Sequence, residues 1–256
     1  MSDPLLLEFE GPIARVTLNR PEAFNAMNAP MRDAFRDAIS QIHATPDIRV
    51  VVLSGAGRGF CAGTDLTETL PEPASLLIDR EYRPILNAIA TAPQIWIAQV
   101  HGSAAGIGAA LALNCDLVTM AEDASIYMAF AAIGLVPDGG STWLLQRSLG
   151  SKRALQAILE GRKIPAQQAV DCGLANAAHS PDALAAETEA LAQRLALGAP
   201  LAAAAAKRLI RSMDGVGYDA AISAEGVEQS ALSASEDARE GIAAFLEKRR
   251  PDFKGR

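Results

Sequence analysis

The sequence predicts an α/β protein in which alternating strands and helices are followed by helices alone. Two apolar runs, RVVVLSG at 49–55 and QIWIAQVHG at 94–102, each end in glycine and are separated by a helical pattern. Strand, helix and strand in this order are typical of crossover units with parallel pairing, in which both faces of each strand are covered. From Pro200 onward the strand pattern is replaced by alanine-rich helical sequence. We therefore expect a core over residues 1–199 and a helical region over 200–256.

The N-terminal part predicts a hairpin and then a helix. LLLEF at 5–9 and IARVTLN at 13–19 are separated by the tripeptide EGP, which suits a tight connection. Asn28 and Pro30 are typical helix-start residues, and a Thr-Pro pair ends the pattern that follows them. The apolar face of this expected helix comprises Ala34, Phe35, Ala38, Ile39 and Ile42.

Residues 84–115 carry no acidic or basic side chain apart from one histidine. The segment is long enough to cross a membrane if it were one helix. Proline, glycine and amide side chains interrupt it, so we interpret it as a helix end, a buried strand and a second buried helix. A third strand–helix unit is expected to have its strand within CDLVTMAED at 115–123. The secondary structure of the apolar segment that follows, ASIYMAFAAIGL at 124–135, is ambiguous. Further helices are expected in STWLL and at 151–159, 165–171 and 182–197.

The composition narrows the function classes. The formal net charge is −7 and no block of Lys or Arg is present, which argues against nucleic-acid and anionic membrane partners. Cys61, Cys115 and Cys172 are far apart, and no His, Cys or acid cluster has metal-ligand spacing, so we expect neither disulfides nor a metal site. The N-terminus lacks the pattern of a secretory signal, and we expect a cytoplasmic protein.

Two glycine-rich loops follow buried strands, SGAGRGFCAGTDL at 54–66 and HGSAAGIGAALAL at 101–113. Residues 57–62 match the dinucleotide pattern GxGxxA, but loop-like sequence follows where that motif requires a helix. The glycines of the two loops can instead play either of two roles. They allow close packing of a helix on a strand, or they allow backbone N–H groups at a helix N-terminus to hold an oxyanion.

Five segments in order along the chain resemble the enoyl-CoA hydratase/isomerase (crotonase) superfamily. They are NRPEAFNAMN at 19–28, GRGFCAGTDL at 57–66, VHGSAAGIGAAL at 100–111, GLVPDGGSTWLL at 134–145 and EGIAAFLEKRRPDF at 240–253. The resemblance implies a crotonase-like spiral of ββα units, a C-terminal helical trimerisation region, and a homotrimer or dimer of trimers. The implied substrate is an acyl-CoA thioester, with no separate cofactor because coenzyme A is part of the substrate.

The resemblance also assigns residues. The two backbone N–H groups of an oxyanion hole map to Ala62 and Ile107, and the two glutamates that family hydratases use map to Ala110 and Phe130, which cannot move a proton. The implied CoA contacts are Ala23, Asn25, Gly63, Asp65, Leu66, Phe245 and Lys248. The last two are three residues apart on one helical face and would contribute to a neighbouring subunit's site.

Asp138 lies in GLVPDGGSTW at 134–143, between a proline and two glycines. Such an aspartate could cap the helix that follows, or it could be a catalytic base. Epoxyacyl-CoA isomerases of the phenylacetate pathway resemble this turn closely, and aroyl-CoA dehalogenases use an aspartate there as nucleophile. Apolar neighbours expected at Trp143, Phe130 and Met128 would desolvate the carboxylate and strengthen it as a base.

We therefore expect an acyl-CoA isomerase that shifts a double bond or opens a ring, with Asp138 as acid and base. The alternatives are a hydratase with a rearranged base, a thioester hydrolase or dehalogenase with Asp138 as nucleophile, and a non-catalytic CoA-binding protein. The acyl chain is not specified, because its expected lining loop, residues 66–75, has the least interpretable sequence.

Overall fold

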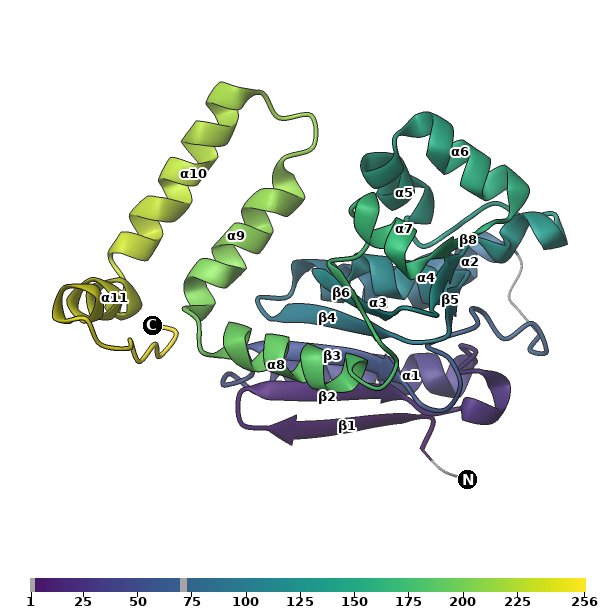
Figure 1. The fold of residues 1–256 in the computed structure, drawn as a ribbon, viewed down its shortest axis with the longest axis horizontal. Coiled ribbons are helices and arrows are strands. Elements are labelled where there is room, and N and C mark those ends of the chain that lie inside the picture. Colours follow the sequence, from purple (N-terminus) through teal and green to yellow (C-terminus); the bar gives the residue numbers. More distant parts are fainter. Residues whose placement is uncertain (1–2, 70–72) are drawn as a thin grey trace.

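The computed structural model describes residues 3–69 and 73–256, so part of the expected acyl-lining loop at 66–75 lies outside the described residues. The main sheet has six strands in the order β1-β2-β3-β4-β6-β9 (Figure 1). Their bounds are β1 Leu5–Glu10, β2 Ile13–Leu18, β3 Val50–Gly55, β4 Ile95–Val100, β6 Leu117–Ala121 and β9 Ala177–His179. β1 and β2 form the predicted antiparallel hairpin, and the other pairings are parallel as expected.

A second sheet gives the fold its repeating unit. It contains β5 (Ser103–Ala105), β7 (Ser125–Tyr127) and β8 (Lys163–Pro165) in the order β5-β7-β8. After β4 in the main sheet the chain enters β5 in the second sheet and then helix α4 (Ile107–Asn114), and after β6 it enters β7. The chain thus alternates between the two sheets in ββα fashion, which confirms the expected spiral.

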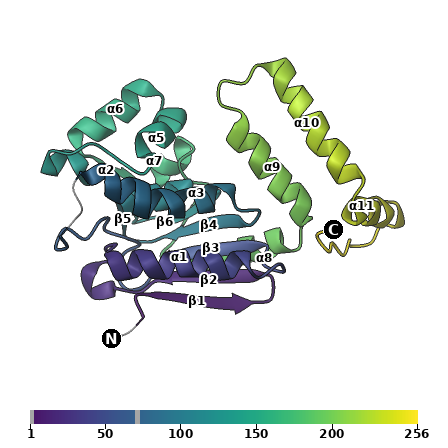
Figure 2. The same ribbon diagram turned by 180° about the vertical axis from the view of Figure 1, so that it is seen from behind.

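Helices cover both faces of the main sheet. The remaining bounds are α1 Ala29–His43, α2 Ala74–Leu77, α3 Arg83–Thr91, α5 Ser141–Leu149, α6 Ser151–Glu160, α7 Ala166–Asp171 and α8 Leu184–Ala196, with short 3-10 helices at Pro21–Ala23 and Ala129–Ile133 and a π-helix at Ile78–Tyr82. Asn28 caps α1 by accepting a hydrogen bond from the Met31 N–H. The ring of Phe35 on α1 stacks on Trp96 of β4, while α8 packs on the opposite face of β3 and β4 (Figure 2).

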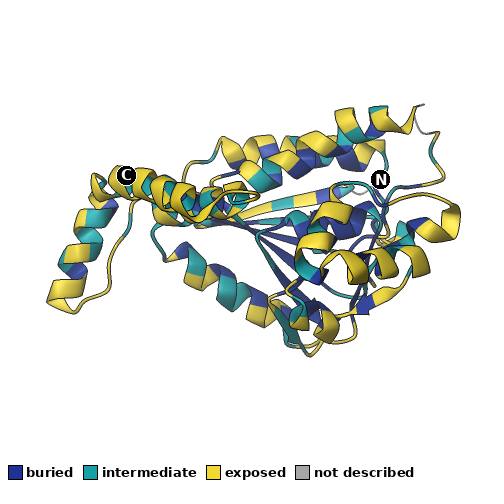
Figure 3. Cartoon of the chain, turned by 90° about the horizontal axis from the view of Figure 1, so that it is seen from above, coloured by how far each residue is buried: buried dark blue, intermediate teal, exposed yellow. Residues whose placement is uncertain are grey.

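Three helices follow the core: α9 (Pro200–Ser212), α10 (Tyr218–Ser233) and α11 (Glu236–Glu247). Both ribbon views show α10 and α11 standing away from the sheets, at the end of the molecule opposite α6. α10 has no buried residue, and the helices near the C-terminus are largely exposed in Figure 3, whereas the strands are buried. The start of α9 at Pro200 coincides with the predicted start of the helical region.

The uncharged segment 84–115 forms most of α3, then β4, β5 and α4, as the interruptions in its sequence predict. None of the helices in the described ranges is long and apolar enough to cross a bilayer. The ambiguous segment 124–135 divides into the short strand β7 and a 3-10 helix.

Candidate active site

The two glycine-rich loops lie side by side. The Cys61 N–H donates to Ser103 O at 3.2 Å, and the Ala105 N–H donates to Cys61 O at 2.8 Å. A Cβ on Gly63 would lie 3.0 Å from the Ala105 carbonyl oxygen, and one on Gly108 would lie 2.5 Å from that of Cys61. At these two positions glycine is required for the loops to approach, so close packing accounts for them.

Helix α4 begins directly after this contact. Gly106 precedes it with a φ of 54°, and Ile107 is its first residue. The Ile107 N–H has no acceptor within the described ranges, as expected for the first turn of a helix. An unpaired N–H at the positive end of a helix dipole favours a negatively charged oxygen. The second loop therefore presents an unpaired N–H group at Ile107, and its role as an oxyanion donor stays a prediction.

The other expected donor is already engaged. The Ala62 N–H donates to the Phe24 carbonyl at 2.9 Å. Phe24 and the next residue, Asn25, have left-handed φ values of 50° and 59°, which are uncommon for residues with side chains. Of the two expected amides, the one at Ile107 is unpaired in the described structure, and the one at Ala62 has a protein partner.

The expectation that Asn25 contacts CoA is wrong. The residue is 0% exposed, and its side-chain amide donates to the carbonyls of Ala56, Gly59 and Phe60 at 2.8–3.1 Å. Its side-chain oxygen accepts from the Arg20 N–H at 2.9 Å. Asn25 therefore ties the first glycine-rich loop to the segment before α1, and this internal role leaves it no polar group for a ligand.

The structure rules out the capping role for Asp138. Gly140 is the N-cap of α5, and no side chain caps that helix. The Asp138 backbone carbonyl accepts from the Ser141 N–H at 3.0 Å, but its side-chain Oδ1 is buried without a hydrogen-bond partner in the described structure. Desolvation by burial raises the pKa of this carboxyl above its ordinary value. The Ser141 hydroxyl, in the same turn, is also buried and unpaired.

The turn that carries Asp138 rests directly on α4. Gly139 has a φ of 61°, and a Cβ there would lie 2.6 Å from both Ile107 Cδ1 and Ala110 Cβ. Asn114, the last residue of α4, donates to the Gly139 carbonyl at 3.2 Å. The unpaired Ile107 amide is thus on α4, and the turn that carries the unpaired carboxylate oxygen packs against the same helix.

The groups nearest Gly139 in this turn are apolar, namely Ala110 Cβ, Ile107 Cδ1 and Leu86 Cδ1. Phe130 and Met128 are buried, with the Phe130 ring beside Gly106, and their contact with Asp138 stays a prediction. Trp143, which was expected to help desolvate Asp138, is instead 47% exposed. The Arg147 guanidinium lies over the Trp143 ring, 4.5 Å from the ring centre. Neither Ala110 nor Phe130 can transfer a proton. Asp138 is therefore the predicted catalytic residue whose side chain can do so.

Cys61 is not a candidate nucleophile. It is buried, and its Sγ donates to the Asn25 carbonyl at 3.2 Å. Burial raises the pKa of the thiol to about 12, so it remains protonated at neutral pH and behaves as a small apolar side chain.

The remaining expected contacts on the first loop differ in role. Ala23 is half-buried, Gly63 is buried, and Leu66 is 63% exposed. The Asp65 carboxylate accepts from Arg20 at 2.9 Å and from the Thr67 hydroxyl at 2.6 Å, and the Thr67 contact is the main reason that its pKa is lowered. The Asp65 side chain therefore ties the loop, and the contact of Asp65 with CoA stays a prediction.

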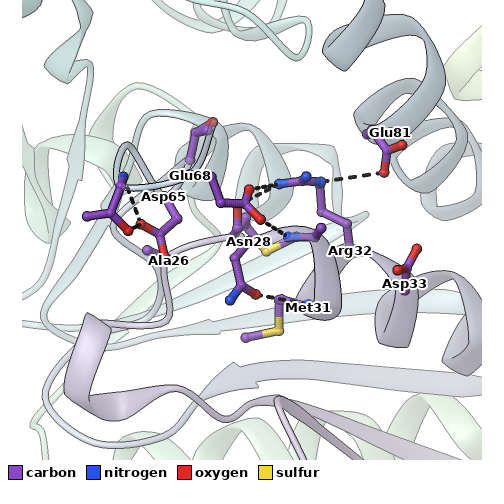
Figure 4. Close-up of polar contacts among 12 residues, drawn as sticks. Ala26, Asn28, Met31, Arg32, Asp33, Asp65, Glu68 and Glu81 are labelled. Carbon is purple, nitrogen blue, oxygen red and sulfur yellow. Dashed lines mark hydrogen bonds and ion pairs between the residues drawn. The ribbon is translucent and has the colours of Figure 1, made fainter. Parts of the chain in front are cut away.

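Sequence reasoning missed Arg32, which anchors the segment after this loop. Its guanidinium is buried and donates to the Glu68 carboxylate at 2.9 Å, and Glu81 lies 3.5 Å away on the other side (Figure 4). Glu68 also accepts from the Ala29 N–H at 2.6 Å, at the start of α1. Arg32 shares the apolar face of α1 with Phe35, three residues later, and a cation at such a position is the signal that indicates a buried ion pair.

Phe245 and Lys248 do not reach this site within one chain. Phe245 on α11 is 82% exposed, and Lys248 ends the helix in a left-handed conformation with a φ of 55°. Both ribbon views place α11 far from α4 and α5. Any contact with the site must therefore come from another subunit.

Comparisons with known proteins find relatives that match nearly the whole chain. A family model described as enoyl-CoA hydratase/isomerase matches residues 8–256. A 1,2-epoxyphenylacetyl-CoA isomerase of Escherichia coli is 36% identical, with 100% of both chains covered, and a probable enoyl-CoA hydratase of Rhodobacter capsulatus is 41% identical, with 95% of both covered. The crystal structure of an enoyl-CoA hydratase from Bacillus anthracis is similar with a TM-score of 0.93 at 30% identity, covering 99% of this chain and 100% of that one.

Proposed function

Because this chain belongs to the enoyl-CoA hydratase/isomerase family, we propose that it is an acyl-CoA isomerase with Asp138 as its acid and base. The observation that carries the proposal is the buried, unpaired carboxylate oxygen of Asp138 in a turn that rests on α4. The E. coli relative named as an epoxyphenylacetyl-CoA isomerase supports a double-bond shift or ring opening in an enoyl-CoA-type thioester.

The proposed reaction needs one proton-transfer group. Asp138 removes a proton from the α-carbon, or from the γ-carbon in the reverse direction, and the negative charge develops on the thioester oxygen. The Ile107 N–H holds that oxygen, and the Ala62 N–H joins it by sharing or releasing its bond to Phe24. Each such donor contributes about 3 kcal/mol to the transition state. The proton then returns to the other end of the conjugated system, so nothing is consumed.

Hydration would need more groups. Addition of water requires one group to activate the water and another to protonate the α-carbon. Ala110 and Phe130, at the positions that resemble those of the family's two glutamates, supply neither. The Rhodobacter relative is named a probable enoyl-CoA hydratase, so a hydratase with a rearranged base is the second candidate function.

We further propose that Phe245 and Lys248 contribute to the CoA site of a neighbouring subunit in a homotrimer or dimer of trimers. The exposed side chains of Phe245 and Lys248 support this. The remaining binding energy for CoA would come from the backbone of the first glycine-rich loop.

The test is the Asp138→Asn variant, assayed in D₂O with a panel of enoyl-CoA esters. We expect the wild-type protein to shift the double bond and to incorporate deuterium at the α-carbon. The variant should lose turnover by about 10²–10⁴-fold and should retain its affinity for the CoA ester. Wild-type exchange by the variant would contradict the assignment of Asp138.

The products separate the alternatives. A 3-hydroxyacyl-CoA as the main product would indicate a hydratase. Appearance of ¹⁸O in the Asp138 carboxylate after turnover in H₂¹⁸O would indicate a nucleophilic mechanism, as in a hydrolase or dehalogenase. Binding without turnover across the panel would indicate a non-catalytic CoA-binding protein.

A further inference from the structure

Asn114 makes two hydrogen bonds from one nitrogen. Its Nδ2 donates to Ala110 O, one turn earlier in α4, at 2.9 Å, and to Gly139 O at 3.2 Å. Both partners are carbonyl acceptors, and an amide nitrogen carries two protons, so this geometry uses the full donor capacity of Nδ2. The side chain is thus oriented by its own helix and directed at the turn that follows Asp138.

Apart from the packing of Gly139 on α4, the turn has few other restraints. Gly139 and Gly140 have left-handed φ values of 61° and 83° and carry no side chain. The Asp138 side chain leaves Oδ1 unpaired, and the backbone bond to Ser141 lies within the turn. Within the described ranges, Asn114 supplies the side-chain hydrogen bond that joins this turn to another element.

Helix α4 therefore connects the two parts of the site. Its first residue, Ile107, presents the unpaired N–H, and its last residue, Asn114, holds the turn. Seven helical steps separate them, about 10 Å at 1.5 Å per residue. Because backbone hydrogen bonds fix this length, they also limit how far the base can move relative to the oxyanion donor.

The C-terminal end of α4 is itself anchored from α9. Arg211 donates to the Asn114 backbone carbonyl at 2.6 Å and to Asp116 at 3.1 Å. Lys207, one turn earlier on α9 and buried, pairs with the other Asp116 oxygen at 2.7 Å. Arg211 therefore holds the last carbonyl of α4, and both cations hold Asp116, two residues after the end of that helix.

We infer that Asn114 is a positioning residue, which fixes the Asp138 turn on α4 at the distance from Ile107 that proton transfer requires. The inference rests on the proposed role of Asp138 as base. Asn114 touches no substrate atom, and it acts through the Gly139 carbonyl alone. A misplaced base slows proton transfer and leaves binding of the remote CoA moiety unchanged.

The test uses Asn114→Leu, which keeps the volume, and Asn114→Ala, which favours the helix and remains informative if the leucine variant folds poorly. Turnover is expressed per binding site, counted by calorimetric titration with an unreactive acyl-CoA thioether. We expect kcat to fall about 10- to 100-fold with KM nearly unchanged. The primary kinetic isotope effect with α-deuterated substrate should increase, because proton transfer becomes more rate-limiting.

Asn176→Leu is the matched control. Asn176 accepts a hydrogen bond from the Val118 N–H at 2.7 Å on β6 and makes no contact with the Asp138 turn in the described structure. An equal loss of kcat in this control would overturn the inference, because it would show a general loosening of the fold. Wild-type kcat and isotope effect in both Asn114 variants would also overturn it. The Asp138→Asn variant, assayed in parallel, separates the proposed base from the proposed positioning residue. If Asp138→Asn stays active, the assignment of Asp138 as base is wrong. If it is inactive and the Asn114 variants have wild-type kcat, only the positioning role of Asn114 fails.

Discussion

The buried, unpaired Oδ1 gives Asp138 a cost in stability as well as its proposed chemical role. A buried carboxylate loses its hydration, and no hydrogen bond to Oδ1 replaces it in the described structure. The raised pKa of this group is the direct result. Such an arrangement is typical of catalytic acids and bases, which are often destabilising in the folded protein.

We predict that Asp138→Asn raises stability at neutral pH. A raised folded-state pKa means that the folded protein binds the Asp138 proton more tightly than the unfolded chain does. The carboxyl therefore lowers the free energy of unfolding progressively as the pH rises from the unfolded-state pKa, about 3.9, through the folded-state pKa. The variant should melt about 2–4 °C higher at pH 7, the shift that ~1 kcal/mol causes in a chain of this size. The difference should disappear as the pH falls below about 4. Calorimetric scans of both proteins across this range measure it, and equal melting temperatures at pH 7 would contradict the prediction.

The roles of single residues were predictable where they depend on neighbouring sequence. Asp138 is conspicuous because proline and two glycines surround it ahead of an apolar run. The role of Asn25 was not predictable, because it depends on three carbonyls that the fold brings from residues 56–60. The engagement of the Ala62 amide likewise depends on Phe24, 38 residues earlier, in a left-handed conformation that the sequence does not specify.

Among secondary-structure elements, periodicity predicted the long ones and failed for the short ones. The parallel strands β3, β4 and β6 and helix α1 were expected from apolar runs and from helix-start residues. The segment 124–135 stayed ambiguous because β7 has three residues and the 3-10 helix has five, too few to establish either repeat. Contacts between elements, such as Asn114 with Gly139, leave no local pattern.

The packing of the Asp138 turn on α4 can be tested with two neighbouring glycines. Gly139→Ala should destabilise the protein and lower kcat, because its Cβ would lie 2.6 Å from Ile107 Cδ1 and Ala110 Cβ. Gly140→Ala is the control, since Gly140 also has a positive φ but a Cβ there would meet nothing within 4 Å. Both variants carry backbone strain of about 1–2 kcal/mol, and Gly139→Ala should lose a further ~1–3 kcal/mol from overpacking. Denaturant unfolding measures the difference, and equal losses would show that the turn is not pressed on α4.

At the scale of the whole molecule, the C-terminal helices lack a sufficient core of their own. α10 buries no residue, and α11 exposes Ile242, Phe245 and Leu246 at helical spacing on one face. A continuous apolar stripe of this kind marks an interaction surface. The proposed homotrimer would cover it and would also bring Phe245 and Lys248 to a neighbour's CoA site.

The proposed homotrimer would couple assembly to substrate binding, and the Leu246→Glu variant tests this coupling. Leu246 is largely exposed in the single chain, so the substitution should leave the fold intact while placing a charge within the proposed subunit interface. We expect light scattering to show a monomer where the wild-type protein is a trimer or hexamer. KM for the CoA ester should rise about tenfold or more, because the neighbour's Phe245 and Lys248 no longer contribute to binding, while kcat changes less.

The control is Leu6→Glu, which changes an exposed leucine on the outer strand β1 and should leave both the mass of the assembly and KM unchanged. A monomeric variant with wild-type KM would show that each subunit binds CoA alone and that the exposed face of α11 serves assembly without contributing to the site.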